Sequence, residues 1–323
     1  MPRIITIVGA TGIQGGSVVR AFLDDPNYSI RAVTRDISSD AAQTLEECGI
    51  EVVEADINDA ESLRAAFAGS YAIFAVTNFF EALPTMGVDK SMKVETRLGL
   101  NLADAAAATE SLAHYVWSTL PKSRRNTGGR IVVPYYESKN RVDDYIRAKH
   151  PQLLQKTTFF WVGWYASNMD YPWFKPMAVP SFGDGPGSYV QMLGVPPWTV
   201  IPLAGDERTN VGLFVRAILD QPQKTLPAKT VAGYVEQETY GELMQVYGAV
   251  QGINVRCVQI PKDDYRALWP VWGELMDSTN SYFEVMSGRA FSTVGHHVLT
   301  RDDLDVQGLV GTAEAFAARK HCG

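Results

Sequence analysis

The sequence Gly9-Ala-Thr-Gly12-Ile-Gln-Gly15 joins a β-branched run at residues 4–8 to a segment whose apolar residues recur at helical spacing. In such a strand–turn–helix unit, the first glycine permits a tight turn, the second lets backbone N–H groups approach a pyrophosphate, and the third lets helix and strand pack closely. The start of the helix adds unpaired N–H groups and the positive end of the helix dipole. The loop therefore predicts a dinucleotide site, the alternative being a glycine-rich turn without a ligand. The residues predicted to contact the dinucleotide here are Gly9, Thr11, Gly12, Ile13, Gln14 and Gly15.

The rest of the N-terminal half repeats this alternation of short strands and helices. Further strands are predicted at 30–33, 51–54, 71–76, 114–117 and 157–161, and helices at 40–48, 60–68, 90–109 and 136–149. The alternation indicates an α/β fold with a parallel sheet and right-handed crossovers. We predict a Rossmann-type doubly wound parallel sheet at residues 1–155, which binds the dinucleotide. A smaller C-terminal α/β substrate lobe at 156–323 follows, and some of its segments return to the sheet.

Composition excludes several other classes of protein. The chain has 323 residues and a net charge of −7, with scattered basic residues, so we expect no direct binding of nucleic acid. The hydrophobic fraction of 46% is typical of a globular chain and argues against disorder. The distant cysteines Cys48, Cys257 and Cys322 form neither a disulfide framework nor a zinc pattern, and no metal site is predicted.

The sequence also predicts where the protein resides. The first residues lack the apolar core and cleavage site of a signal peptide. The uncharged stretch at 185–205 is interrupted by Gly185, Pro186 and further Gly and Pro residues, which a membrane helix would not contain in such number. We therefore expect a cytoplasmic protein without membrane contact. The sequence leaves the oligomeric state open.

The end of the second strand predicts which coenzyme binds. Arg35 stands where the adenosine ribose of a bound dinucleotide lies. An acidic residue there favours the free 2′-hydroxyl of NAD, whereas an arginine favours the 2′-phosphate of NADP through paired hydrogen bonds. Arg35 therefore predicts NADP(H), and the adjacent Asp36 keeps NAD(H) as the alternative.

Two further loops follow strands of the same sheet. Asp56 and Ile57, after the third strand, are predicted to bind the adenine, although Asp56 could instead cap the next helix. The loop after the fourth strand lies in the binding crevice of such a sheet. Its residues predicted to contact the nicotinamide-side ribose are Thr77, Asn78 and Phe79.

A candidate catalytic group follows the fifth strand. Tyr135 and Lys139 are four residues apart, so they share one helix face. A nearby ammonium stabilises a phenolate and lowers the pKa of the phenol, as acid–base work at neutral pH requires. Lys139 can also hold the nicotinamide ribose, and Ser118 can hydrogen-bond the substrate oxygen. Tyr136 is the competing phenol, and a plain amphipathic helix pair is the alternative.

Aromatic residues predict the character of the substrate. Half of residues 159–174 are aromatic, and most of them follow the sixth strand at the crevice. Such side chains offer a large apolar face with one polar tip. They predict a small apolar, aromatic or polycyclic substrate, unless these rings merely pack the small lobe. The predicted substrate contacts are Phe80, Trp164, Tyr165, Trp269 and Trp272.

Five segments of the chain together resemble one known family. They read Gly-Ala-Thr-Gly-Ile-Gln-Gly-Gly-Ser-Val at 9–18, Val-Thr-Arg at 33–35, Ala-Val-Thr-Asn-Phe-Phe-Glu at 75–81, Val-Trp-Ser-Thr-Leu-Pro at 116–121 and Ser-Lys-Asn-Arg-Val-Asp-Asp-Tyr-Ile-Arg at 138–147. These segments resemble NmrA-like proteins, which are atypical members of the short-chain dehydrogenase/reductase superfamily. The resemblance is specific over residues 3–170 and loose over the remainder.

The resemblance implies a Rossmann domain that prefers NADP(H), a small C-terminal lobe and a functional lysine at Lys139. It also implies nicotinamide contacts from Trp164 and Asn168, in a segment where relatives read Pro-Gly-Phe-Phe-Met-Glu-Asn and this chain reads Val162-Gly-Trp-Tyr-Ala-Ser-Asn168. Some relatives reduce quinones, ketones or phenylpropanoid-type alkenes, whereas others sense the coenzyme and regulate a transcription factor. Many members lack the superfamily's tyrosine, so Tyr135 favours an enzyme.

We therefore expect an NADPH-dependent oxidoreductase of specialised metabolism. It would reduce a carbonyl, quinone or conjugated alkene of a small apolar, aromatic molecule, with Tyr135 and Lys139 supplying the proton and Ser118 orienting the oxygen. One alternative is an NADP(H)-sensing protein without turnover that presents its second lobe to a protein partner. Another is a non-redox isomerase or cyclase that uses Tyr135 as acid and base.

Overall fold

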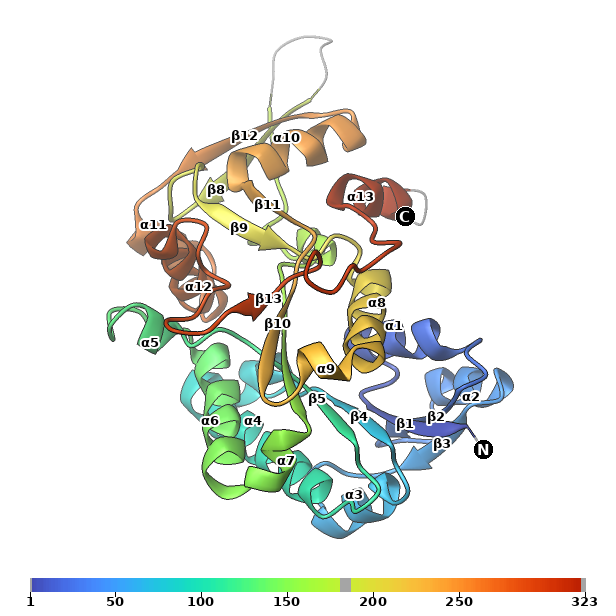
Figure 1. Ribbon diagram of the computed structural model, residues 1–323. Coiled ribbons are helices and arrows are strands. Elements are labelled where there is room, and N and C mark those ends of the chain that lie inside the picture. Colours follow the sequence, from blue (N-terminus) through green and yellow to red (C-terminus); the bar gives the residue numbers. More distant parts are fainter. Residues whose placement is uncertain (1, 181–186, 321–323) are drawn as a thin grey trace.

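One parallel sheet of eight strands organises the computed structural model, which describes residues 2–180 and 187–320 (Figure 1). The strand order is β13-β10-β6-β5-β4-β1-β2-β3. The chain runs from β1 to β3 in one direction and continues with β4 on the other side of β1. The crevice outside the carboxyl ends of β1 and β4 is therefore the switch point where ligands bind in such folds. The strands are β1 (Arg3–Val8), β2 (Tyr28–Thr34), β3 (Glu51–Glu54), β4 (Ala72–Ala75), β5 (His114–Thr119), β6 (Thr157–Val162), β10 (Lys229–Gly233) and β13 (Val298–Leu299).

Helices cover both faces of this sheet. The strands β4, β5 and β6 are buried along their whole length, as expected for parallel strands covered on both sides. On β4, Phe74 packs with the helices of one face and its neighbour Ile73 with those of the other, because successive side chains alternate. The helices are α1 (Ile13–Phe22) and α8 (Glu207–Asp220) on one face, and α3 (Ala60–Phe67), α4 (Leu83–Ala107) and α6 (Pro134–Lys149) on the other.

The later part of the chain builds a second layer beyond one end of the sheet, drawn at the top of Figure 1. It contains an antiparallel pair, β9 with β11, and a three-stranded sheet of order β12-β8-β7. Its strands are β7 (Met177–Val179), β8 (Ser188–Leu193), β9 (Val200–Leu203), β11 (Glu236–Thr239) and β12 (Asn254–Gln259). Its helices are α10 (Tyr240–Gln251), α11 (Lys262–Leu268), α12 (Trp272–Met286) and α13 (Thr312–Lys320). The remaining short helices are α2 (Asp40–Glu47), η1 (Phe79–Glu81), α5 (Ser123–Asn126), α7 (Pro151–Gln155), η2 (Ala166–Asp170) and α9 (Pro222–Thr225).

The predicted α/β class and parallel sheet are confirmed, and the bounds of the predicted strands and helices agree within two residues, with one larger difference. The helix predicted at 90–109 begins at Leu83, and the backbone bends at Gly87, whose φ of 72° is non-helical. The first turns of α4 were not predicted, because Gly87 and Pro84 are residues that usually interrupt a helix. The residues after 156 supply three strands of the main sheet, β6, β10 and β13.

Some residues used for sequence predictions, namely Gly185, Pro186 and Cys322, lie outside the described residues. No helix in the described ranges combines the length and the apolar character needed to cross a membrane.

Candidate functional site

The glycine loop has the geometry that a dinucleotide requires. Gly9 has a φ of +69°, and its carbonyl accepts the N–H of Gly12 at 2.9 Å, which closes the turn. A Cβ on Gly15 would lie 2.1 Å from the Gly9 carbonyl oxygen, so only glycine fits between strand and helix. Gly12 caps α1 without a side-chain hydrogen bond. The first N–H groups of α1 are therefore left to an anionic ligand, and the residues present fit a pyrophosphate.

A chain of hydrogen bonds links this loop to the predicted substrate side. Ser118 Oγ donates to Gln14 Oε1 at 2.8 Å, and Gln14 Nε2 donates to the Tyr165 hydroxyl at 2.6 Å. These residues come from the end of β5, the first turn of α1 and the segment after β6. Three residues predicted for three different roles thus meet at the carboxyl edge of the sheet. Burial raises the pKa of Tyr165, so its hydroxyl stays protonated at neutral pH.

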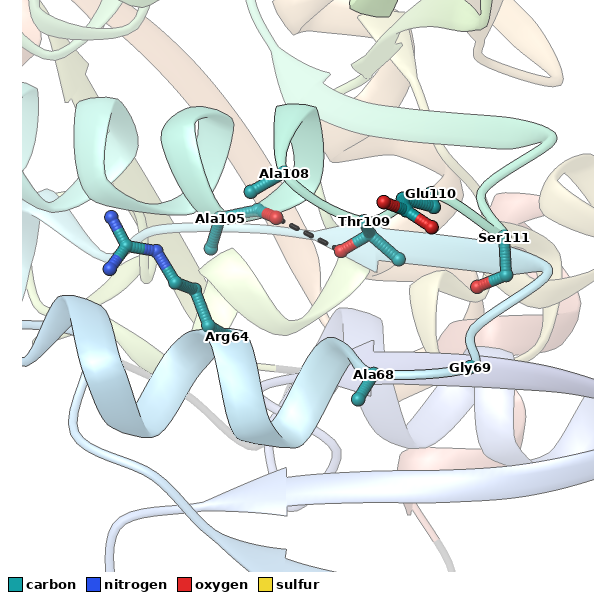
Figure 2. A pocket seen from close by; sticks show the side chains of 8 residues that line it. All are labelled: Arg64, Ala68, Gly69, Ala105, Ala108, Thr109, Glu110 and Ser111. Carbon is teal, nitrogen blue, oxygen red and sulfur yellow. Dashed lines mark hydrogen bonds between the residues drawn. The ribbon is translucent and has the colours of Figure 1, made fainter.

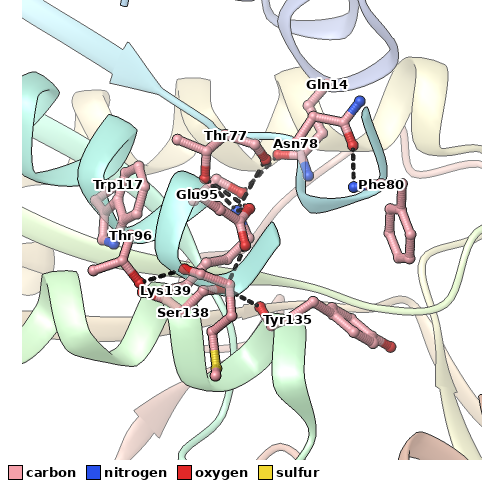
Figure 3. A network of polar contacts seen from close by, with 12 residues as sticks. Gln14, Thr77, Asn78, Phe80, Glu95, Thr96, Trp117, Tyr135, Ser138 and Lys139 are labelled. Carbon is pink, nitrogen blue, oxygen red and sulfur yellow. Dashed lines mark hydrogen bonds and ion pairs between the residues drawn. The ribbon is translucent and has the colours of Figure 1, made fainter. Parts of the chain in front are cut away.

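Lys139 forms a buried ion pair that the sequence did not predict. Its Nζ lies 2.9 Å from Glu95 Oε1 and donates to the carbonyl and hydroxyl oxygens of Thr77 at 2.9 and 2.8 Å (Figure 3). The same carboxylate accepts hydrogen bonds from the hydroxyls of Thr77 and Ser138. An ammonium has three N–H donors, so these three acceptors satisfy Lys139 completely.

The signal that could have revealed Glu95 is its place on α4. It shares the buried face of the helix with Gly99, Leu102 and Ala106, at spacings of four, seven and eleven residues. A charged residue on an otherwise apolar stripe needs a partner of opposite charge. The lysine is that partner, and it comes from α6.

The Tyr135 side chain is not activated by Lys139 as the sequence predicted. Its hydroxyl lies 2.9 Å from Thr279 Oγ1 on α12, and Figure 3 shows the ring directed away from Lys139. Burial raises the pKa of Tyr135 to about 12, whereas the expected effect was a lowered pKa. That expectation was wrong because the amine pairs with Glu95. Tyr136, the competing phenol, is buried too, and burial raises its pKa well above the usual value.

The adenosine end of the predicted site is open to solvent. Arg35 follows β2 directly and its Nη1 lies 2.5 Å from Glu81 Oε1 of η1. Asp56 accepts hydrogen bonds from the backbone and the side-chain amide of Asn58, which lower the pKa of Asp56. It closes the turn before α3, whose N-cap is Asp59 rather than Asp56. Ile57 is half-buried against the core, and Thr77 and Asn78 lie after β4 as predicted.

Rings from three separate segments stack beside the site. Phe80 of η1 stacks on Trp272 of α12 at 5.7 Å and 19°, and Trp272 stacks on Trp173 at 4.4 Å and 13°. Trp173 stacks in turn on Tyr171 at 5.1 Å. Phe80 also lies 5.3 Å from the Tyr135 ring. The structure thus brings together the predicted Phe80 and Trp272, and adds Trp173.

The other predicted aromatic contacts are part of the core. Trp164 is buried edge-on against Phe174, and its indole N–H donates to the side-chain oxygen of Asn168 at 3.2 Å. Phe79 is buried at the start of η1. Trp269 is half-buried, and its indole N–H has no partner among the described residues.

A surface depression of about 620 Å³ lies at the opposite edge of the sheet (Figure 2). It is bordered by the ends of α3 and α4, which precede β4 and β5. The residues that line it are Arg64, Ala68, Gly69, Ala105, Ala108, Thr109, Glu110 and Ser111, and no predicted site residue is among them. Ser118 lies at the other end of β5, and the glycine loop follows the carboxyl end of β1 in the same parallel sheet, so this depression is separate from the candidate site.

Fold and glycine loop together define a dinucleotide-binding protein of the Rossmann class. The chain belongs to the NmrA-like family, whose model matches residues 1–293. It is 28% identical to the NmrA-like family domain-containing oxidoreductase cpsB of Aspergillus campestris, over 89% of this chain and 84% of the relative. It is 30% identical to the corresponding oxidoreductase malD of Malbranchea aurantiaca, over 80% of this chain and 76% of the relative. The solved structure of NmrA, a negative transcriptional regulator, in complex with NADP is similar in fold, with a TM-score of 0.72 at 20% identity over 98% of this chain and 94% of that one.

Proposed function

We propose that this protein is an NADPH-dependent oxidoreductase that reduces a carbonyl, quinone or conjugated alkene of a small apolar, aromatic molecule in specialised metabolism. The observation that carries the proposal is the position of Gln14. It lies in the first turn of α1, beside the predicted phosphate site, and its side chain binds Ser118 and Tyr165. One residue thus connects the coenzyme loop with hydroxyl groups suited to a substrate oxygen.

The coenzyme would be held by the parts of the chain that fit it. The uncapped start of α1 would bind the pyrophosphate, and the exposed guanidinium of Arg35 would bind the 2′-phosphate. Asp56 and Ile57 would face the adenine, and the loop after β4 with Lys139 would face the nicotinamide ribose. The segment with Trp164 and Asn168 would border the nicotinamide. When bound, NADPH supplies a hydride, which adds to one carbon of the substrate's double bond.

The chain's own residues must then supply a proton to the other atom of that double bond. Tyr135 is one candidate, although its hydroxyl shares a hydrogen bond with Thr279. Tyr165 is the second, because its hydroxyl accepts from Gln14 and no acceptor for its own proton is present in the described part of the chain. Ser118 would hydrogen-bond the substrate oxygen from the same chain of groups. The stacked rings of Phe80 and Trp272 would bind the apolar body of the substrate.

The test begins with binding and continues with turnover. Titration with NADPH should quench the protein's tryptophan fluorescence, and loss of NADPH absorbance should follow with members of a panel of aromatic quinones, ketones and enones. Tyr165→Phe should retain coenzyme affinity and lower turnover about 100-fold, as expected for loss of a general acid. Tyr135→Phe tests the other candidate in the same assay, and the proton donor is the phenol whose removal lowers turnover. If neither NADPH nor NADH binds, the proposed function is refuted.

A second function, coenzyme sensing without turnover, is favoured by the state of Lys139. Its amine is satisfied by Glu95 and Thr77, and the pKa of Tyr135 is raised rather than lowered. The acid–base pair of the superfamily is therefore not assembled as the sequence predicted. Tight NADP(H) binding combined with silence across the whole substrate panel would support the sensor.

A further inference from the structure

Arg35, the residue proposed to bind the 2′-phosphate, is already paired with a carboxylate of the chain. Its Nη1 lies 2.5 Å from Glu81 Oε1, and the two side chains are 64% and 53% exposed. The Arg35 charge also contributes to lowering the pKa of Asp56, so a second carboxylate lies in its field. Asp36 follows directly in the sequence. The guanidinium thus has acidic groups around it, and the Glu81 carboxylate forms an ion pair with it.

A carboxylate and a phosphate compete for the same donors. A guanidinium presents its N–H groups in a planar fork that both anions accept in pairs. A 2′-phosphate must displace Glu81 from Arg35 and then remain near the displaced negative charge, whereas the 2′-hydroxyl of NAD(H) requires neither step. Glu81 should therefore weaken binding of NADP(H) and leave binding of NAD(H) unchanged.

We propose that Glu81 is a specificity-determining residue that competes with the 2′-phosphate for Arg35 and so sets the preference between NADP(H) and NAD(H). The inference rests on the proposed coenzyme site. It concerns the loop after β4, because Glu81 ends η1 (Phe79–Glu81). A segment assigned to the nicotinamide side of the coenzyme thus also acts on the adenosine side.

The test is Glu81→Gln, which keeps the size of the side chain and removes its charge. The turn should persist, because η1 is capped by Asn78 Oδ1 on the Phe80 N–H and Glu81 takes no part in that bond. Isothermal titration with NADP⁺ and, separately, with NAD⁺ measures the two affinities. Exposed ion pairs are weak, so the variant should bind NADP⁺ about two- to five-fold more tightly, with NAD⁺ unchanged. The gain should shrink at high salt, because these charges are screened.

Two controls separate this competition from general electrostatics. Glu110→Gln removes the same charge at the opposite edge of the sheet and should leave both affinities as they are. In an Arg35→Gln background, Glu81→Gln should no longer strengthen NADP⁺ binding, because the contested guanidinium is gone. An unchanged ratio of the two affinities in E81Q, or an equal gain without Arg35, would overturn the inference. Failure of the wild-type protein to bind either coenzyme would instead refute the proposed function.

Discussion

The buried pair of Glu95 and Lys139 gives the sharpest test of how the site is built. The Glu95 side chain is 2% exposed and the Lys139 side chain 9%, and their charged atoms are 2.9 Å apart. Loss of one partner from a buried ion pair leaves an uncompensated charge in the interior and destabilises proteins by about 3–5 kcal/mol. Glu95→Gln removes the charge but keeps the size and an accepting oxygen. At an unfolding entropy of about 2.1 cal/mol/K per residue, the 323-residue chain should melt about 4–7 °C lower.

Thermal unfolding followed by circular dichroism at neutral pH measures this shift. Lys139→Met and the double variant E95Q/K139M complete a cycle in which the charge is removed from either side or from both. Contacting charges are coupled, so the double variant should be less destabilised than the sum of the single changes. An unchanged midpoint in E95Q, or single effects that simply add, would show that the amine does not depend on this carboxylate.

Three further predictions address the loop, the core and the rings. Gly15→Ala should abolish coenzyme binding because its Cβ would lie 2.1 Å from a backbone oxygen, whereas Gly16→Ala, whose nearest contact is 3.4 Å, should bind normally in the same titration. Burial lowers the pKa of His114 to about 4, so the folded state binds fewer protons than the unfolded state between pH 4 and 6.5. The contribution of neutral His114 to the free energy of unfolding is therefore complete above about pH 6.5 and is lost as the pH falls, by about 2 kcal/mol between pH 7 and 5. Denaturant titration at several pH values should show this loss of stability, and the loss should be smaller in His114→Gln. Phe80→Ala should raise the KM for aromatic substrates several-fold without changing NADPH affinity, which initial rates and titration measure together.

The first half of the fold could be predicted because its signals are local. The strand at residues 4–8, the glycine loop and the helix after it are adjacent in the sequence, and each later strand–helix unit repeats that pattern. The strands β10 and β13 could not be predicted in the same way. They join the sheet after long excursions through the second layer, so what fixes them is their pairing with β6 and with each other.

The candidate site shows the same division. Residues on one loop or one helix turn, such as Gly9 and Gly12, were predictable because the backbone alone determines their geometry. The spacing of Tyr135 and Lys139 placed both on one helix, but it held no information about α4 or α12. The partners on those helices, Glu95 and Thr279, decide where each side chain points. The spacing argument was correct that both residues lie on one helix, but tertiary packing determines which groups their side chains contact.

The Glu95 pair also constrains how Lys139 can meet a ribose hydroxyl. All three of its donors are used, so a new contact requires one to be exchanged. Loss of the contact between Lys139 and the Thr77 hydroxyl destabilises the site least, because that hydroxyl still donates to Glu95 when the amine leaves it. Loss of the contact with Glu95 destabilises it most, because a buried ammonium is then left unpaired. Glu95 therefore keeps the amine in place throughout any exchange, and Thr77 is the position at which coenzyme and protein would share it.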